Sequence, residues 1–299
     1  MQNWSDIYFT SRDGLRLYAR HYRAPQSLRR PLVCLAGLTR NSRDFHDLAS
    51  ALARQDGREV FAIDCRGRGR SQHDANWKNY AILVELNDVL DFMTMRGLNR
   101  AALLGTSRGG LIAMLMAALR PNALGAVVLN DIGPVIEREG LARIVAYVGR
   151  VPLPATWSEA TELVYELNRR HFPAVPPEQW AEFARQVFNE ESDLPAPSYD
   201  ANLSKAVSMM DGPLPELWPQ FAGLARLPLL AIRGENSDIL SETTLKGMGA
   251  RHPSLEAITV RGQGHAPLLK DDHTIAAIAA FLARTDGAAS GMAQISAVA

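Results

Sequence analysis

The chain has 299 residues, of which 47% are hydrophobic and 21% are charged, a composition typical of a globular enzyme with a large buried core. Its 32 Lys and Arg residues balance 32 Asp and Glu residues, so charge favours neither nucleic acid nor a membrane as partner. No apolar run approaches the ~20 residues of a membrane span, and the first residues lack the basic and apolar regions of a signal peptide. We therefore expect a cytoplasmic protein.

Strands and helices alternate through the first part of the chain. The hydrophobic pattern predicts strands at 7–10, 15–22, 32–36, 60–64, 101–104 and 125–130, and helices at 45–54, 82–95 and 110–120. The first two strands form a hairpin around Asp13-Gly14. The two cysteines, Cys34 and Cys65, fall in or beside apolar strands, which indicates small buried side chains rather than a disulfide or a metal pair. The alternation predicts a mostly parallel sheet with helices on both faces.

The alternation stops at Gly133 and resumes near Leu229. Between them, helical stretches at 141–148, 159–170, 178–189 and 202–210 are separated by prolines. Strands at 229–233 and 255–260 and helices at 243–248 and 274–283 follow. We predict a core of residues 1–133 and 220–284 and an inserted helical cap of residues 134–219. The tail, residues 285–299, is small and polar and is expected to be disordered.

The stretch Gly105-Thr106-Ser107-Arg108-Gly109 is a G-x-S-x-G pentapeptide between a predicted strand and a predicted helix. A strand that feeds directly into a helix requires a sharp turn, and glycine on both sides of the serine removes Cβ atoms that would clash there. The serine hydroxyl is then exposed at the edge of the sheet, at a helix N-terminus. This context favours a nucleophilic Ser107 over a serine that only caps the helix.

A serine nucleophile needs a base to take its proton and an acid to orient that base. Among seven histidines, only His265 lies in a tight glycine-lined loop, after the last predicted strand. Asp238 follows the strand at 229–233 and is the preferred acid. Asp131, at the end of the strand at 125–130, and Glu235 are the alternatives.

Two further motifs accompany the pentapeptide. Asp64-Cys65-Arg66-Gly67-Arg68-Gly69-Arg70-Ser71 has the form D-x-R-G-x-G-x-S, and Ala36-Gly37-Leu38 follows the predicted strand at 32–36. With the order Ser, Asp, His, these motifs make the chain similar to capped, esterase-like enzymes of the α/β-hydrolase fold over roughly residues 7–283. That family usually has His-Gly-x before its oxyanion loop, and here Ala36 replaces the histidine whose hydrogen bonds steady the loop.

The resemblance implies a mechanism and assigns roles to residues. His265 takes the proton of Ser107, Asp238 orients His265, and the backbone N–H groups of Leu38 and Arg108 bind the oxyanion. The placement of the acid in the family favours Asp238. No metal or cofactor is expected.

The side chain of Arg108 and the loop around Asp64 have structural interpretations. A guanidinium at the depth of Arg108 needs a carboxylate partner, which we expect to be Asp131 or Asp64, although a substrate carboxylate is the alternative. Asp64 and Arg66 are expected to hold their loop below the edge of the sheet.

The leading interpretation is a carboxylic ester hydrolase for small, largely apolar substrates. A lactonase, a carbon–carbon bond hydrolase, an aminopeptidase and a catalytically idle, hydrolase-like binding protein are the alternatives. The expected partner is a small-molecule ester. The cap aromatics are expected to serve packing more than a pocket; they are Trp157, Tyr165, Phe172, Trp180, Phe183 and Phe188.

Overall fold

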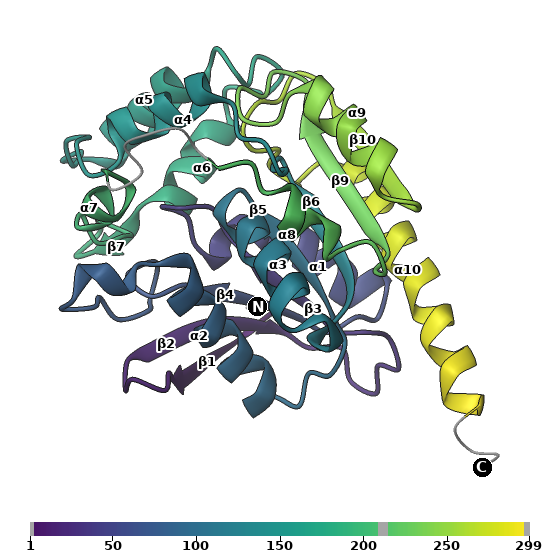
Figure 1. Cartoon of the computed structure of the whole chain (residues 1–299). Helices are drawn as coiled ribbons and strands as arrows, with labels where there is room; N and C mark the ends of the chain where they lie inside the picture. The colour runs from purple at the N-terminus through teal and green to yellow at the C-terminus, as the bar shows by residue number, and fades with distance from the viewer. Residues whose placement is uncertain (1–2, 209–214, 296–299) are drawn as a thin grey trace.

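The computed structural model describes residues 3–208 and 215–295. Its centre is an eight-stranded sheet with the order β1-β2-β4-β3-β5-β6-β9-β10 (Figure 1). The strands are β1 Ser5–Thr10, β2 Arg16–Tyr22, β3 Leu32–Leu35, β4 Val60–Asp64, β5 Ala101–Thr106, β6 Leu124–Asn130, β9 Leu229–Gly234 and β10 Leu255–Val260. β2 pairs antiparallel with both β1 and β4, and every other pair is parallel. The predicted mostly parallel sheet is confirmed.

Helices cover both faces of the sheet. The main ones outside the β6–β9 connection are α1 His46–Gln55, α2 Ile82–Met95, α3 Arg108–Leu119, α9 Glu242–Arg251 and α10 Asp272–Ile295. Alternate strand residues divide between two cores, as the two-residue period of a strand requires. Leu103 and its alternates pack with α2 and α3 on one face, and Leu104 and its alternates pack with α1 and α10 on the other.

The connection between β6 and β9 contains the segment predicted as a cap. Its elements are α4 Arg138–Tyr147, α5 Trp157–Asn168, α6 Gln179–Val187, β7 Asn189–Glu191, β8 Leu194–Ala196, α7 Leu203–Ser208 and α8 Trp218–Ala222. The four predicted helices are present, although the end of the last, at Met209 and Met210, lies outside the described residues. The antiparallel pair β7–β8 was not predicted. In Figure 1 α4, α5, α6 and α7 gather together beyond one end of the sheet.

Residues 134–217 form a segment that returns to its starting point, and we call it the insertion. The backbone N–H of Leu217 donates to the carbonyl oxygen of Pro134 at 2.7 Å. The insertion also binds the core between these ends. Arg43 donates to the carbonyl oxygens of Gln186 and Phe188, and the backbone N–H of Gly69 donates to the carbonyl oxygen of Ser198.

The expectation of a disordered tail is wrong for residues 285–295, because α10 continues to Ile295; residues 296–299 lie outside the described residues. The side chain of Thr285 is buried, and the carboxylate of Asp286 accepts hydrogen bonds from the backbone N–H of Arg30 and from the guanidinium of Arg58. The small, polar residues of this segment suggested disorder. Its start is held instead by the buried guanidinium of Arg58 and the backbone N–H of Arg30. In Figure 1 the last turns of α10 extend beyond the rest of the molecule.

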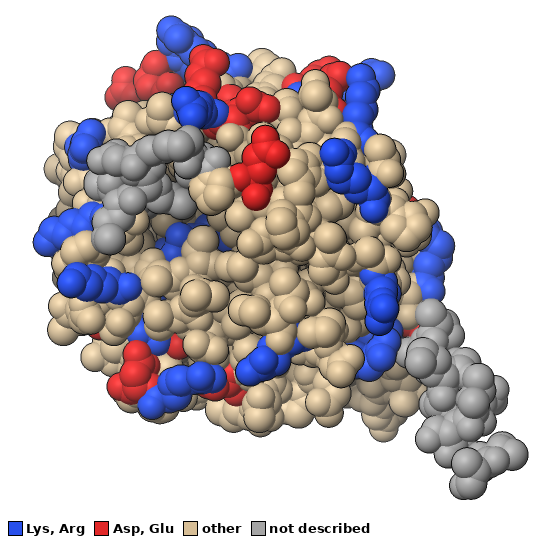
Figure 2. Space-filling view, in the orientation of Figure 1, with Lys and Arg blue, Asp and Glu red and all other residues tan. Residues whose placement is uncertain are grey.

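Charge is mixed on the molecular surface. On the face shown in Figure 2, basic and acidic side chains both lie around the periphery, and an uncharged area covers α3 and α8. Within residues 3–208 and 215–295, no helix has the length and apolarity to cross a bilayer.

Candidate active site

Ser107 lies in a sharp turn between β5 and α3. Its φ of 51° and ψ of −115° are sparsely populated by residues with side chains. Two glycines permit the turn: a Cβ on Gly105 would come within 2.3 Å of the backbone of Gly109, and one on Gly109 within 2.2 Å of the Leu35 carbonyl oxygen. The predicted reason for both glycines is confirmed, and the turn directs Ser107 toward the carboxyl ends of the strands.

His265 reaches Ser107 from the far edge of the sheet. The loop after β10 passes so closely over the end of β9 that a Cβ on Gly234 would lie 2.5 Å from the carbonyl oxygen of Gly264. The side-chain amide of Asn130, the last residue of β6, donates to the carbonyl oxygen of Pro267 at 3.0 Å. These contacts hold the histidine loop above the middle of the sheet.

Ser107, His265 and Asp131 form a continuous chain of hydrogen bonds. The Ser107 Oγ lies 2.9 Å from His265 Nε2, and His265 Nδ1 lies 2.8 Å from Asp131 Oδ2. The carboxylate of Asp131 also accepts from the backbone N–H of Gly234 at 2.7 Å and from Ser237 Oγ at 2.6 Å. The Asp131 side chain is fully buried and that of His265 is 7% exposed. This arrangement can take a proton from Ser107 and hold the resulting imidazolium beside a carboxylate.

The expectation that Asp238 orients His265 is wrong, because the structure places Asp131 there. β6 lies next to β5, with Thr106 opposite Asn130 in the register, so Ser107 and Asp131 emerge side by side. Asp238 is four residues past the end of β9 and faces the insertion, where Arg143 on α4 binds it through two hydrogen bonds, of 2.6 and 2.9 Å. The third candidate, Glu235, accepts from the backbone N–H of Gly262.

The Arg108 side chain pairs with neither expected aspartate. Its Nε donates to Glu85 Oε2 at 2.7 Å and its Nη2 to the carbonyl oxygen of Tyr80 at 2.7 Å. Glu85 lies on α2, which packs against α3. Burial acts to raise the pKa of the Glu85 carboxyl, but the positive charges of Arg108 and Arg68 outweigh it, and the pKa lies below its ordinary value. The sequence pattern does not single out Glu85, because it lies within a helix rather than at the end of a strand.

The loop after β4 has the structural role that was predicted for it. The buried carboxylate of Asp64 accepts from the backbone N–H groups of Ser42 at 2.6 Å and Arg70 at 2.8 Å. Gly69 has a φ of +56°, and a Cβ there would lie 2.0 Å from Asp64 Oδ2. The Arg66 guanidinium forms ion pairs with Asp13, Asp74 and Asp88, with nitrogen-to-oxygen distances of 2.8, 2.7 and 2.6 Å.

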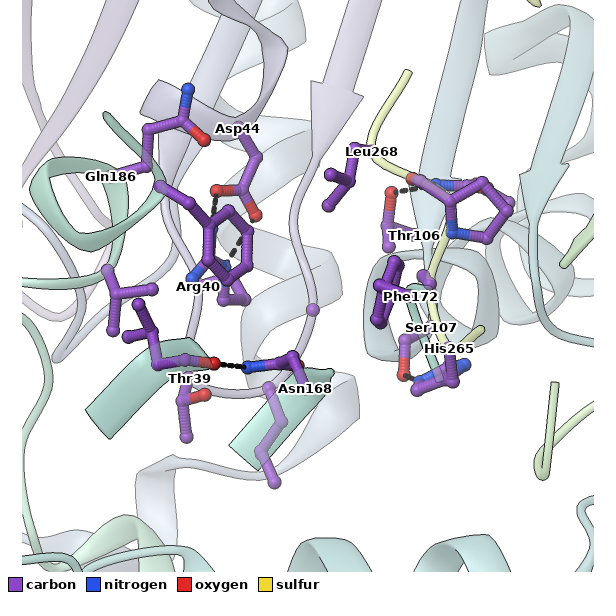
Figure 3. A pocket seen from close by; sticks show the side chains of 18 of the residues that line it. Thr39, Arg40, Asp44, Thr106, Ser107, Asn168, Phe172, Gln186, His265 and Leu268 are labelled. Carbon is purple, nitrogen blue, oxygen red and sulfur yellow. Dashed lines mark hydrogen bonds and ion pairs between the residues drawn. The ribbon is translucent and has the colours of Figure 1, made fainter. Parts of the chain in front are cut away.

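A pocket of about 210 Å³ opens beside Ser107 and His265. In Figure 3 Phe172 lies next to these two residues, and Arg40 and Asp44 lie across the pocket. The insertion supplies much of the apolar lining, with Ile144, Tyr147, Val164, Leu167, Phe172, Phe183 and Val187. Of the six aromatics expected to serve packing, Phe172 and Phe183 also line the pocket, whereas Trp180 is 3% exposed inside the core of the insertion.

Each of the two arginines that line the pocket is paired with a carboxylate. Arg40 binds both carboxylate oxygens of Asp44, with its Nε 2.9 Å from Oδ2, and Arg143 binds Asp238. Burial acts to raise the pKa of Asp238, but the hydrogen bonds and charge of Arg143 outweigh it and lower the pKa. Both arginines of the pocket are therefore neutralised by a carboxylate, and no sequence motif identifies either arginine.

Both cysteines are free thiols, as predicted, and burial raises the pKa of Cys34. Among the described residues, no group of three or more His, Cys, Asp or Glu side chains could hold a metal ion.

Comparison with known proteins places the chain in a family. The family model described as alpha/beta hydrolase fold matches residues 30–272. The chain belongs to the α/β-hydrolase fold family. This α/β hydrolase is 39% identical to a solved α/β hydrolase from Novosphingobium aromaticivorans, with a TM-score of 0.88 over 95% of this chain and 99% of the other.

Relatives with named activities include hydrolases. The 3-hydroxybutyrate-oligomer hydrolase of Cupriavidus necator is 30% identical over 275 residues, which cover 88% of this chain and 92% of the relative. The sn-1-specific diacylglycerol lipase ABHD11 of Mus musculus is 33% identical over 125 residues, or 41% of this chain and 40% of the relative. The family and these relatives support a hydrolase.

Proposed function

We propose that this α/β hydrolase cleaves carboxylic esters with small, neutral, largely apolar acyl groups through an acyl-enzyme on Ser107. The observation that carries the proposal is the chain of hydrogen bonds from Ser107 Oγ through His265 to Asp131, which opens into an apolar pocket. The named relatives act on a hydroxybutyrate oligomer and on diacylglycerol, and both substrates contain carboxylic ester bonds.

The reaction has two steps that mirror each other. Ser107 Oγ bonds to the acyl carbon as its proton passes to His265 Nε2, and the carbonyl electron pair moves to the oxygen. That oxyanion is bound by the backbone N–H groups of Leu38 and Arg108. The tetrahedral intermediate collapses, and the alcohol leaves with the proton of His265. Water then attacks the acyl carbon, gives a proton to His265, and releases the acid as Ser107 regains its proton.

The proposed acyl preference comes from the pocket. Its apolar lining favours aliphatic acyl chains, and each CH₂ that becomes buried contributes about 0.8 kcal/mol, or roughly fourfold in kcat/KM. Because Arg40 and Arg143 are paired with Asp44 and Asp238, a substrate carboxylate would meet no uncompensated cation among these groups.

The test is a panel of p-nitrophenyl esters of rising acyl length, with 3-hydroxybutyrate oligomers, lactones and a peptide amide alongside. We expect kcat/KM to rise with each CH₂ until the pocket is filled. Ser107→Ala should lose on the order of 10⁶ in kcat, and a fluorophosphonate should label Ser107 alone. A clean Ser107→Ala preparation that keeps a few per cent of activity would contradict the assignment, and a flat profile would contradict the apolar pocket.

A further inference from the structure

We infer that Arg68 and Glu85 are positioning residues that hold the two peptide groups of the oxyanion hole at a fixed separation. The inference rests on the proposed function, in which the N–H groups of Leu38 and Arg108 bind the oxyanion. These two residues come from separate segments, one after β3 and the other after β5, so something must set their relative position.

A buried bridge connects the two segments. Arg68 donates from Nε to the carbonyl oxygen of Leu38 at 2.8 Å and from Nη1 to Glu85 Oε1 at 2.6 Å. The other carboxylate oxygen of Glu85 accepts from Nε of Arg108 at 2.7 Å. Arg68 and Glu85 are each 1% exposed. Hydrogen bonds between charged groups are the stronger kind, so the path from Leu38 to Arg108 is rigid.

The bridge acts on the backbone of the first oxyanion donor. The carbonyl oxygen of Gly37 shares a peptide plane with the N–H of Leu38, and it accepts from the backbone N–H of Arg40 at 3.2 Å. Arg68 holds the next plane through the Leu38 carbonyl. Two successive peptide planes are thereby oriented. Ala36, whose methyl group cannot form a hydrogen bond, contributes no such support.

The second donor, the backbone N–H of Arg108, is held through its peptide group and through the Arg108 side chain. The carbonyl oxygen of Ser107, in the same peptide plane as the N–H of Arg108, accepts from the backbone N–H groups of Gly110 and Leu111. The Arg108 side chain is fixed by Glu85. Two guanidinium groups share the one Glu85 carboxylate, so these three side chains together carry one net positive charge.

The experiment measures kcat and KM of Arg68→Met on a neutral p-nitrophenyl ester. It also measures the inhibition constant of an alkyl trifluoromethyl ketone, whose adduct with serine carries an oxyanion. We expect kcat to fall roughly 10- to 100-fold, below the loss typical of removing a donor outright. The inhibition constant of the ketone should rise by a similar factor, and KM should change little. Arg68→Lys should recover only part of this, because one nitrogen cannot replace the separate Nε and Nη1 donors. If Arg68→Met does not fold, Arg68→Lys gives the same readout.

Arg58→Met is the matched control. Arg58 is also fully buried and paired with two aspartates, but it lies in the contact with α10 rather than at the site. It should lose stability without a selective loss of ketone binding. Ketone affinity and kcat that stay at the wild-type level in a folded Arg68 variant, or fall no more than in Arg58→Met, would overturn the bridge. A wild-type enzyme that a fluorophosphonate does not label would instead overturn the proposed function.

Discussion

Both the main chain and the carboxylate of Asp131 are held in place beside His265. It has a φ of 54°, and its backbone N–H donates to the carbonyl oxygen of Ile232 at 2.7 Å. With Gly234 and Ser237 also bound to its side chain, the carboxylate has one orientation. Its value in the proposed mechanism depends on that orientation.

Asp131→Asn should therefore lower kcat by about 10⁴, because an amide favours the wrong tautomer of the histidine. Asp238→Asn should lower kcat for a neutral ester less than tenfold. Steady-state kinetics on both variants checks this, with circular dichroism to show that each is folded. A larger loss in Asp238→Asn would return the orienting role to Asp238.

Asp238→Asn should also change which acyl groups are accepted. Without its carboxylate partner, Arg143 becomes an uncompensated cation in the pocket, able to bind a carboxylate through charge-assisted hydrogen bonds. The ratio of kcat/KM for a succinate half-ester to that for a butyrate ester should rise on the order of tenfold, or about 1.4 kcal/mol. Adding Arg143→Leu should abolish the rise, and an unchanged ratio would show that the Arg143–Asp238 pair does not control selectivity.

The contrast between these two aspartates shows what the sequence could reveal about the site. Ser107 and His265 were predictable because glycines and strand ends surround them, and these local signals determine local geometry. The acid was not, because both aspartates follow apolar strands. The structure brings Asp131 to His265 across 134 positions and Asp238 to Arg143 across 95 positions, and no local pattern encodes either contact.

At the level of elements, the turn at Ser107 depends on close packing between β3, β5 and α3. Gly109→Ala should lower the free energy of unfolding by about 3 kcal/mol, because the new Cβ would meet the Leu35 carbonyl oxygen. Gly249→Ala is the matched control on α9, where the nearest atom would be 3.9 Å away, and it should raise the free energy of unfolding by about 0.5–1 kcal/mol. Urea unfolding of both variants checks this, and equal effects would contradict the packing argument.

Elements with strong periodicity were predicted well, and short ones were missed. The bounds of α2, Ile82–Met95, agree with the prediction because fourteen residues give several repeats of the helical period. β7 and β8 have three residues each, too few for an alternation to stand out. β7 contacts α6 and β8 contacts α5, and a local pattern does not reveal these contacts.

At the scale of the whole molecule, Asp286 ties the C-terminal helix to the strand region through Arg58. Deleting residues 285–299, or substituting Asp286→Asn, should lower the free energy of unfolding by about 2–4 kcal/mol, because Arg58 is fully buried and loses a partner. Asp56 remains beside it. An unchanged free energy of unfolding would show that the contact between Asp286 and Arg58 does not stabilise the fold.

The effect of Asp286→Asn should depend on pH. Burial acts to raise the pKa of Asp286, but Arg58 outweighs it and the pKa lies below the ordinary 3.8. The ionised carboxylate therefore stabilises the fold above pH 3.8, and this contribution is lost as the pH falls through the lowered pKa. The stability difference between wild type and Asp286→Asn should be constant near neutrality and shrink below about pH 4, as followed by urea unfolding across pH. A difference that grows in acid would contradict this linkage.

The hydrogen bond between Leu217 and Pro134 has a consequence for how this enzyme could diverge. A segment whose two ends lie together can be replaced without disturbing the rest of the fold. Here the two ends of the insertion meet just beyond Asp131. The core itself holds Asp131 through Ile232, Gly234 and Ser237. A foreign segment grafted between these two ends would bring a new pocket wall to an unaltered Ser107, His265 and Asp131, the residues of the proposed mechanism. Selectivity and chemistry can thus evolve as separate modules within one chain.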